Sequence, residues 1–421
     1  MKYTNYDMNA YNLHIINTDK FKTITVGVAF RRKIEKKEIT IRNLLKEIMI
    51  DSTANYPTEK SLIIATENLY DLKLLAANYR VGNYAIMTFR TRFLNEKYTE
   101  EGMNRESIKF LLDLIFNPKL DNSIDKCKKK IEKSILSLKD NKIRYSLSKL
   151  LETTNDKPYS YNAYGYLEDL EKITNDDIKN YYNSLIKDDI VDVFVVGDVD
   201  DGEIKKIFKE YFKVTTFHKQ ECNLLVDELA NNKKISEYRE VDQVNQTQLA
   251  LLCNLRGLTD YERKYVMPVY TEMLGGTANS ILFDAVREKN SYAYYVNAVT
   301  KSYDNIMMIY SGIEKGNEKK VTKIIEKTLL SISKGTFDDA KFKSAKETII
   351  SAITSSTDTP MGIITNYYAM TLVNSKDISE RIKNISAVSR EDIINVSKKI
   401  HIHTMFILED GANEEDNNKQ N

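Results

Sequence analysis

Apolar and polar positions follow strand-like or helix-like periods over most of the chain, and together they predict a mixed succession of both elements. Alternation or short apolar runs predict strands at 21–30, 79–81, 84–94, 191–196, 248–253, 292–296 and 305–311. Helical spacing covers 41–49, 58–75, 107–116, 123–139, 141–152, 176–185, 201–211, 261–274, 280–286, 318–333 and 337–354. This mixture predicts an α+β fold in which helices cover one face of a sheet.

The order of elements begins again after the middle of the chain. The run SREDIINVSKKIHIHTMFILEDG resembles the earlier TNDDIKNYYNSLIKDDIVDVFVVGD, and matching Asp392 to Asp177 gives an offset of 215 residues. Matching Asp338 to Asp121 gives 217. Two independent landmarks with nearly one offset predict an internal duplication, hence two homologous halves, each a mostly antiparallel sheet covered by helices.

The periodicity weakens between the halves, where polar clusters predict a linker. We therefore expect an N-terminal domain over 1–217, a linker over 218–240 and a C-terminal domain over 241–411. The last residues, 412–421, are polar throughout and are predicted to be a disordered tail.

The charge balance argues against a nucleic-acid or membrane-surface partner. Basic residues number 62 and acidic residues 61, and the two signs are interspersed. The short basic patches at 31–37 and 126–133 are predicted to be solvated faces. Three distant cysteines cannot form a full disulfide framework, and the chain has neither an apolar leader nor a run of 18 apolar residues. These features predict a cytoplasmic protein without a membrane span.

The most informative stretch is LGGTANSILFDAVREKNSYAYYV, residues 274–296. It opens with Gly275 and Gly276, which permit a positive φ or the close approach of another backbone, and Thr277 follows. A predicted helix carries Arg287, and a predicted strand carries Tyr294 seven residues later. This arrangement could hold a peptide-like ligand, and an ordinary surface loop, helix and strand is the alternative interpretation.

This stretch resembles the C-terminal half-signature of the insulinase (M16) metallopeptidase family. The resemblance implies an M16, LuxS-like metallohydrolase-type fold. In the family the signature's Arg and Tyr help hold the substrate carbonyl near zinc, which implies substrate-binding roles for Arg287, Tyr294 and the Gly275-Gly276-Thr277 loop. The run ENLYDLKLLAANYRVGNYAIMTFRTRFLNEKY is similar to a zinc-less bacterial branch, although the residues 73–75 depart from its pattern. That branch is related to the non-catalytic subunit of mitochondrial processing peptidase.

The family's zinc motif, His-x-x-Glu-His on a helix with a distal Glu, has no counterpart. Two His at i and i+4 share a helix face, and the Glu beside them activates water. The matching stretch is Asn43-Leu44-Leu45-Lys46-Glu47, with Asn43 in place of the first His, Lys46 in place of the base and Glu47 in place of the second His. The distal Glu falls near Cys127, and 22–217 contains no His.

Other candidates for chemistry are weaker. His401 and His403 lie two apart on a predicted strand and could chelate a metal, whereas His14 and His218 stand alone. Cys127, among lysines, could have a lowered thiol pKa, but it has no evident base partner. Glu47 beside Lys46 is predicted to belong to a solvated helix face.

These observations predict a non-catalytic subunit that binds peptide and pairs with an active zinc-bearing M16 subunit as a heterodimer, or with itself. No cofactor is expected on this chain, and zinc is expected only on the partner. An edge strand, 84–94, is predicted to add a peptide by β-augmentation. The alternatives are a stand-alone peptide-binding or scaffold protein, and an enzyme with an unrelated site.

Overall fold

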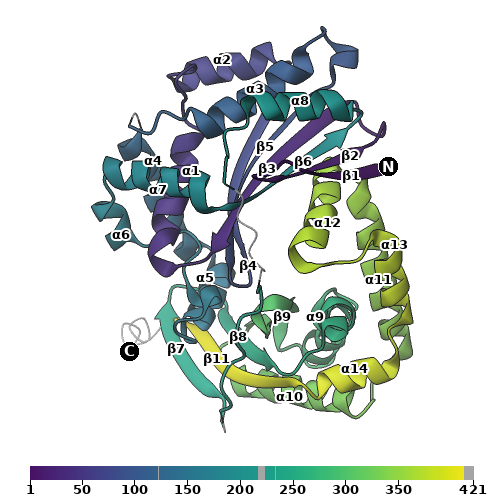
Figure 1. Ribbon diagram of the computed structural model, residues 1–421. Coiled ribbons are helices and arrows are strands. Elements are labelled where there is room, and N and C mark those ends of the chain that lie inside the picture. Colours follow the sequence, from purple (N-terminus) through teal and green to yellow (C-terminus); the bar gives the residue numbers. More distant parts are fainter. Residues whose placement is uncertain (122, 217–222, 233, 412–421) are drawn as a thin grey trace. The chain divides into compact units, whose positions relative to one another are not determined.

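The computed structural model of the chain describes residues 1–121, 123–216, 223–232 and 234–411 (Figure 1). The chain forms two compact units. Unit 1 comprises Met1–Leu136, Asn162–Leu224 and Thr357–Leu372, and unit 2 comprises Ser137–Tyr161, Leu225–Ser356 and Val373–Asn421. The division of the chain at 217 and 241 stays a prediction. Part of the proposed linker, His218 and the proposed disordered tail lie outside the described residues.

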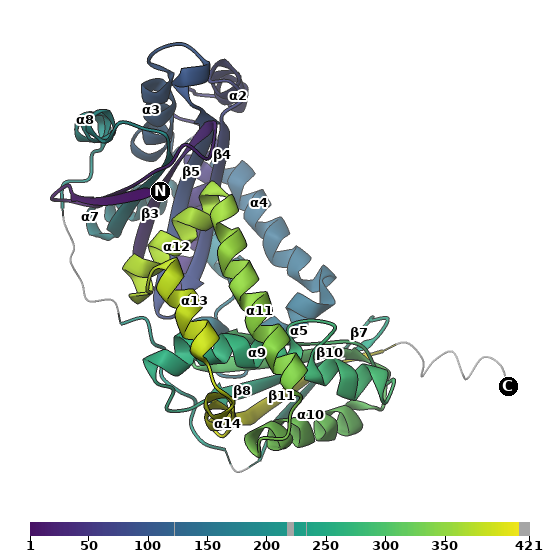
Figure 2. The same cartoon turned by 90° about the vertical axis from the view of Figure 1, so that its right-hand side faces the viewer.

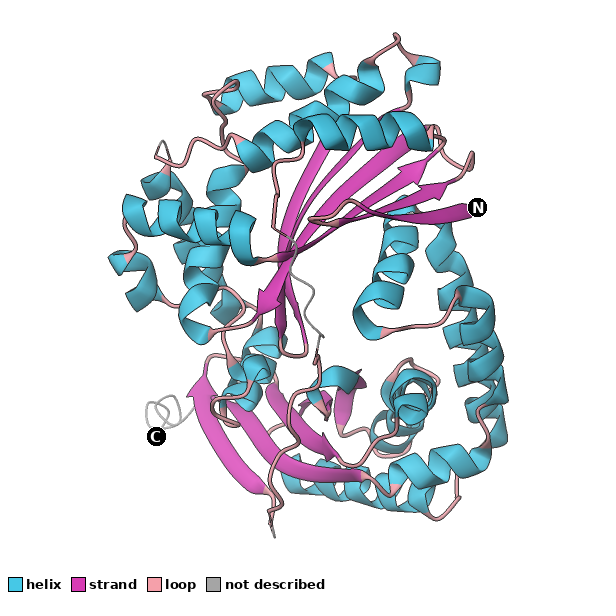
Figure 3. Cartoon of the chain, in the orientation of Figure 1, coloured by secondary structure: helices cyan, strands magenta, loops and turns pink. Residues whose placement is uncertain are grey.

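Both units combine strands with helices (Figure 3). The strands are β1 Lys2–Asp7, β2 Asn12–Asn17, β3 Thr23–Lys33, β4 Lys73–Val81, β5 Tyr84–Leu94, β6 Ile190–Gly197, β7 Ser236–Asp242, β8 Thr247–Leu255, β9 Ala293–Lys301, β10 Ile306–Ile313 and β11 Ile400–Asp410. The α-helices are α1 Ile39–Met49, α2 Glu59–Asn68, α3 Met103–Phe116, α4 Ile124–Leu136, α5 Lys142–Glu152, α6 Leu167–Lys172, α7 Asn175–Asp188, α8 Asp201–Tyr211, α9 Met267–Gly275, α10 Glu318–Ser333, α11 Asp339–Ser355, α12 Pro360–Val373, α13 Ile378–Ala387 and α14 Arg390–Ser397. No helix in the described ranges is long and apolar enough to cross a membrane.

Unit 1 is built on a six-stranded sheet in the order β1-β2-β6-β3-β5-β4. The strands β2 and β6 are parallel, and the other neighbours are antiparallel. Because side chains alternate along a strand, Val26 and Val28 of β3 enter a core shared with α1, α3 and α7. Gly27 and Ala29 lie on the opposite face, which α12 covers (Figure 2).

Unit 2 repeats this arrangement. Its five strands follow the order β7-β11-β8-β10-β9, which matches β2-β6-β3-β5-β4 place for place, with one parallel pair at the corresponding position. The matching sequence landmarks are capping boxes: Thr174 and Asp177 cap α7, and Ser389 and Asp392 cap α14. The prediction of an α+β fold with two homologous, mostly antiparallel halves is confirmed.

The helices α5 and α12 hold equivalent places in the two halves, and each packs in the unit built mainly by the other half. In unit 2, Leu150 of α5 belongs to a buried cluster with Leu252 of β8 and Phe406 of β11. In unit 1, the Tyr368 ring of α12 meets the Phe194 ring of β6 edge-on, with 5.4 Å between ring centroids. Neither packing partner is evident from local sequence, because each lies far along the chain.

The predicted peptide-binding edge strand at 84–94 is wrong. This segment is β5, which is hydrogen-bonded on both sides, to β3 and to β4. The strands at the ends of the described sheet are β1 and β4. The predicted helix over 58–75 is too long, because its last residues belong to the start of β4. The helix α2 ends at Asn68, and the positive φ angles of Tyr70 and Asp71, 57° and 58°, reverse the backbone before β4 begins.

Candidate functional site

The helix α1 carries the residues at the positions of the missing zinc motif. Its Leu44, Leu45 and Ile48 are fully buried in the core of unit 1, which fixes the rotation of the helix about its axis. Lys46 Nζ and Glu47 Oε1 are 2.5 Å apart, and their side chains are only 17% and 18% exposed. The prediction of a solvated face is wrong here, because the two charges neutralise each other in a mostly covered position.

Asn43 is a buried hydrogen-bonding centre. Its Nδ2 donates to the carbonyl oxygens of Ile39 at 3.1 Å and Ala163 at 2.9 Å. Its Oδ1 accepts from Nδ2 of Asn78 on β4 at 3.0 Å. Both amide hydrogens and the amide oxygen are therefore engaged, and Asn43 joins α1 to β4 and to the loop before α6.

Cys127 of α4 is fully buried, at the position where the distal Glu would fall. Burial raises the pKa of its thiol, and the negative charge of Asp51 acts in the same direction. The Sγ atom lies 3.9 Å from Ser123 Oγ. The predicted lowering of the thiol pKa is wrong, because the neighbouring lysines of α4 extend to the surface and burial dominates at Sγ.

These residues do not fit a zinc ion. An amide, an ammonium group and a paired carboxylate replace two imidazoles and a free carboxylate, and the thiol nearby is held neutral by burial. Among the residues that the structure describes, no group of three or more His, Cys, Asp or Glu is placed to hold a metal ion.

The described histidines do not form a metal site. The strand pairing of β11 shifts between Ile402 and Thr404, and His403 Nδ1 lies 2.7 Å from Thr404 Oγ1. Burial lowers the pKa of His403, whereas His401 is exposed. In unit 1, His14 is buried against Asp192, with 3.4 Å between Nε2 and Oδ1. No third metal ligand accompanies His401 and His403 in the described ranges.

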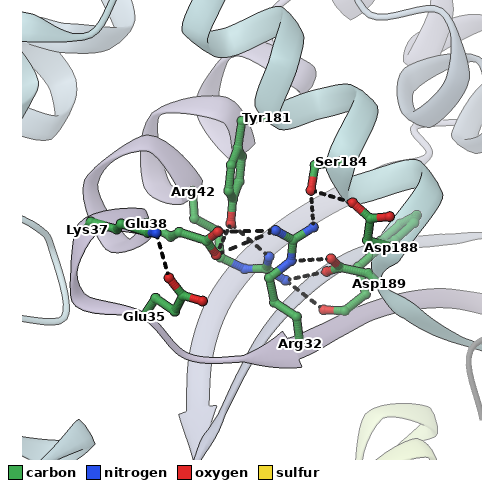
Figure 4. Close-up of polar contacts among 10 residues, drawn as sticks. Arg32, Glu35, Lys37, Glu38, Arg42, Tyr181, Ser184, Asp188 and Asp189 are labelled. Atoms are coloured by element: carbon green, nitrogen blue, oxygen red, sulfur yellow. Dashed lines mark hydrogen bonds and ion pairs between the residues drawn. The ribbon is translucent and has the colours of Figure 1, made fainter. Parts of the chain in front are cut away.

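A buried ion-pair network beside Asn43 was missed at the sequence level (Figure 4). Arg32 of β3 and Arg42 of α1 converge on Asp189, and Arg42 Nη2 lies 3.0 Å from Asp189 Oδ2. Arg42 also donates to the hydroxyl of Tyr181 on α7 at 3.2 Å, and Arg32 lies 3.3 Å from Glu38. The Asp189 side chain is inaccessible to solvent, so the basic patch at 31–37 is not wholly a solvated face.

The network fixes the start of α1 rather than forming an open site. Burial of the guanidinium acts to lower the pKa of Arg42, but the charges of Asp189 and Tyr181 and the hydrogen bonds to both together outweigh it, so the pKa is raised. Because Arg42 also donates to the carbonyl oxygen of Phe30 at 2.8 Å, the groups of this cluster largely satisfy one another. A strand ending in two arginines followed by charged residues was the only local signal.

In unit 2, Arg287 and Tyr294 present their side chains to solvent. Arg287 lies on a π-helical segment, Phe283–Glu288, with its guanidinium carbon 4.9 Å from the Phe283 ring centroid. Tyr294 lies on β9 and is 54% exposed. Neither side chain forms a hydrogen bond or ion pair with another part of the described chain, so both are free to meet a ligand. Their role in substrate binding stays a prediction.

The glycine pair is used for close packing. A Cβ atom on Gly275 would lie 2.7 Å from the backbone nitrogen of Ala298, so α9 and β9 approach each other more closely than another residue allows. Gly276 has a φ of −80°, and Gly275 is not among the positive-φ residues. Gly276 and Thr277 are exposed. Close approach is thus confirmed, and positive φ is not required.

Comparison with known proteins gives a consistent result. The family model described as "Peptidase M16 inactive domain" matches residues 172–349. The chain is 28% identical over 408 residues to the "Probable inactive metalloprotease YmfF" of Bacillus subtilis, covering 94% of this chain and 95% of that protein. A conserved protein from Enterococcus faecalis matches with a TM-score of 0.92 and 23% identity, over 99% of this chain and 100% of that one. A peptidase M16 inactive domain from Pseudomonas fluorescens matches with a TM-score of 0.79 and 14% identity, over 97% and 98%.

Proposed function

We propose that the chain is an inactive member of the M16 peptidase family, that it binds peptide and that it pairs with an active, zinc-bearing M16 subunit. The observation that carries the proposal is the contrast between the two halves. On α1, the side chain of Asn43 is fully engaged and Lys46 is paired with Glu47, so that no zinc-binding set remains. In unit 2, Arg287 and Tyr294 are exposed and form no hydrogen bond or ion pair within the described chain, although the Arg287 guanidinium lies over the Phe283 ring.

The exposed side chains of Arg287 and Tyr294 suit a peptide backbone. Arg287 offers a planar guanidinium that can donate two parallel hydrogen bonds to a carbonyl or carboxylate group. Tyr294 offers a phenolic hydroxyl that can donate to a carbonyl oxygen. We infer that these groups hold part of a peptide whose scissile bond is cleaved at the zinc of the partner.

The strand β4 gives unit 1 a means of binding an extended peptide. It ends the described sheet, so one row of its backbone groups is not paired within that sheet. On the helix-covered face of the sheet, β4 contacts α1, because Asn78 of β4 donates a hydrogen bond to Asn43 of α1. β-Augmentation on β4 replaces the predicted addition to 84–94, and it provides affinity through backbone hydrogen bonds without a metal.

The test is co-purification of the affinity-tagged, full-length chain from its native host. We expect the protein to be in the cytoplasm there. We expect one recurrent partner that contains His-x-x-Glu-His, and we expect peptidase activity and zinc only in the complex. The chain purified alone should contain no stoichiometric zinc. Repeated absence of such a partner would favour a stand-alone peptide-binding or scaffold protein. Chelator-sensitive activity of the lone chain would reject the proposal.

A further inference from the structure

A cavity of about 210 Å³ lies within unit 1, between the sheet and α12. Gly27 forms part of its floor, and Met361, Ile364 and Tyr368 of α12 form much of the other side. Tyr79 of β4 and Arg90 of β5 also line the cavity. Apart from Arg90 the walls are aliphatic, aromatic or hydroxyl-bearing, so the cavity suits an apolar side chain.

Arg90 is a cation without an anion. Its Nε is buried without a hydrogen-bond partner, and its Nη1 meets only the thioether sulfur of Met361, which is a weak acceptor. No carboxylate in the described part of the chain forms an ion pair with it. Burial lowers the pKa of Arg90. On the same sheet face, by contrast, Arg31 lies 3.5 Å from the buried Asp192.

The position of Arg90 directs it into the cavity. Its antiparallel neighbours are Gly27 on β3 and Leu75 on β4. A Cβ atom on Gly27 would lie 3.3 Å from Arg90 Cγ and 3.9 Å from Ile364 Cδ1, so the missing side chain leaves the space between them open. Tyr79 and Arg90 both line the cavity, which places the phenol and the guanidinium in one environment.

We propose that this pocket binds the C-terminal residue of a peptide, with its apolar side chain in the cavity and its terminal carboxylate on Arg90. A carboxylate would give the partly desolvated guanidinium its missing counter-charge, and it could accept two parallel hydrogen bonds from it. A Glu side chain has too short an alkyl stem to fill the apolar space, and a small inorganic anion would leave it empty. Leu75 and Tyr79 are 56% and 42% exposed on the same face of β4, where they can contact the preceding residues.

This inference rests on the peptide-binding part of the proposed function and not on the zinc-bearing partner. It is therefore tested on the full-length chain alone, by fluorescence anisotropy with N-terminally labelled octapeptides. One peptide ends in Leu with a free carboxylate, and a second is the same sequence with a C-terminal amide. A third has an internal Glu and a C-terminal amide.

We expect the free acid to bind at least about tenfold more tightly than either amide, which corresponds to about 1.4 kcal/mol. Arg90→Met should abolish this preference. Arg92→Met is the matched control: Arg92 is exposed on the same face, two residues along β5, and its loss should leave the preference intact. Gly27→Val should weaken binding of the Leu-ending peptides by filling the cavity, without changing any charge.

The outcomes separate the two levels of the argument. If the free acid and the amides bind equally and Arg90→Met changes nothing, the pocket assignment is wrong while peptide binding stands. If the peptide with an internal Glu binds in an Arg90-dependent way, the ligand of Arg90 is an acidic side chain rather than a terminal carboxylate, and the inference is overturned. If no peptide binds at all, the peptide-binding function falls with it. Thermal melts of each variant establish that a loss is not unfolding.

Discussion

Asn78 Nδ2 on β4 donates a hydrogen bond of 3.0 Å to Asn43 Oδ1 on α1, and this contact joins the edge strand to the helix that lacks the zinc ligands. The amide of Asn43 also binds the carbonyl oxygen of Ala163 at 2.9 Å. The position has thus become a structural junction, and its side chain has no atom left for a metal or a substrate.

We therefore predict that Asn43→Ala lowers stability without lowering the activity of the assembled complex. Removing the amide deletes its hydrogen bonds to Asn78 and Ala163, each worth about 0.5–1.5 kcal/mol, while Asn78 keeps its bond to the carbonyl oxygen of Arg42 and water can reach the exposed Ala163. Urea denaturation measures the loss. Lys46→Ala is the comparison and should cost less, because Glu47 retains some access to solvent. A large fall in activity with either folded variant would restore a catalytic role to α1.

The network around Asp189 should be a sensitive point of unit 1. Asp189 is the shared buried anion for Arg32 and Arg42, so Asp189→Ala leaves two guanidinium groups without their main charge partner. We expect a loss of about 3–5 kcal/mol in the free energy of unfolding. Lys37→Ala removes the exposed pair with Glu35, also drawn in Figure 4, and should change nothing measurable. Equal effects of the two substitutions would contradict the difference in burial.

Asp192 should make part of the stability depend on pH. Burial alone would raise the pKa of its carboxyl group, but the hydrogen bond with His14 and the charge of Arg31 lower it below its ordinary value. The charged form is therefore favoured by folding. Its contribution is present above the unfolded-state pKa of about 3.9 and is lost as the pH falls through the lower folded-state pKa.

The measurement is the free energy of unfolding of the wild type and of Asp192→Asn between neutral and acid pH. The wild type should be the more stable protein near neutrality, and the difference should shrink as the solution is acidified below about pH 4. Asn12 also contacts the carboxylate and is unchanged in the variant. A difference that stays constant over the whole range would show that Asp192 does not ionise differently in the two states.

Local signals account for the elements that the sequence predicted well. The segments 201–211 and 318–333 coincide with α8 and α10, because each carries a complete amphipathic period. The strands β1 and β2 were missed. Both are short, and β2 is stabilised by a parallel pairing with β6 almost half the chain away, so that His14 faces Phe194. Strand propensity calculated over a short stretch of sequence does not reveal a pairing partner that lies so far along the chain.

The candidate site was also predictable from the sequence only in part. The replacement of the zinc ligands by Asn43, Lys46 and Glu47 is visible in the sequence, because the spacing on one helix turn is local. What these residues do instead is not visible, since Asn43 depends on Ala163 and Asn78 from other elements. Arg90 gave no sequence signal either. Its significance comes from a neighbouring Gly27 and from α12, which are distant in sequence.

Arg287 and Tyr294 in unit 2 give the most direct test of function. Arg287→Ala combined with Tyr294→Phe should lower peptide turnover by the complex while the two subunits remain assembled. The physical reason is that neither side chain supports the fold through a hydrogen bond within the described chain, whereas both can donate to a bound peptide. We expect at least a tenfold fall in kcat/KM, or about 1.4 kcal/mol.

Lys289→Ala is the matched control, because Lys289 is an exposed cation two residues from Arg287 and is not one of the residues to which a substrate-binding role is assigned. Size-exclusion chromatography establishes assembly, and single substitutions show whether the two donors act on one carbonyl group. Non-additive losses would indicate a shared ligand atom or group. If the double variant turns over peptide at the wild-type rate, Arg287 and Tyr294 are surface residues, and the substrate is held by other parts of the chain, with β4 and the Arg90 pocket as the remaining candidates.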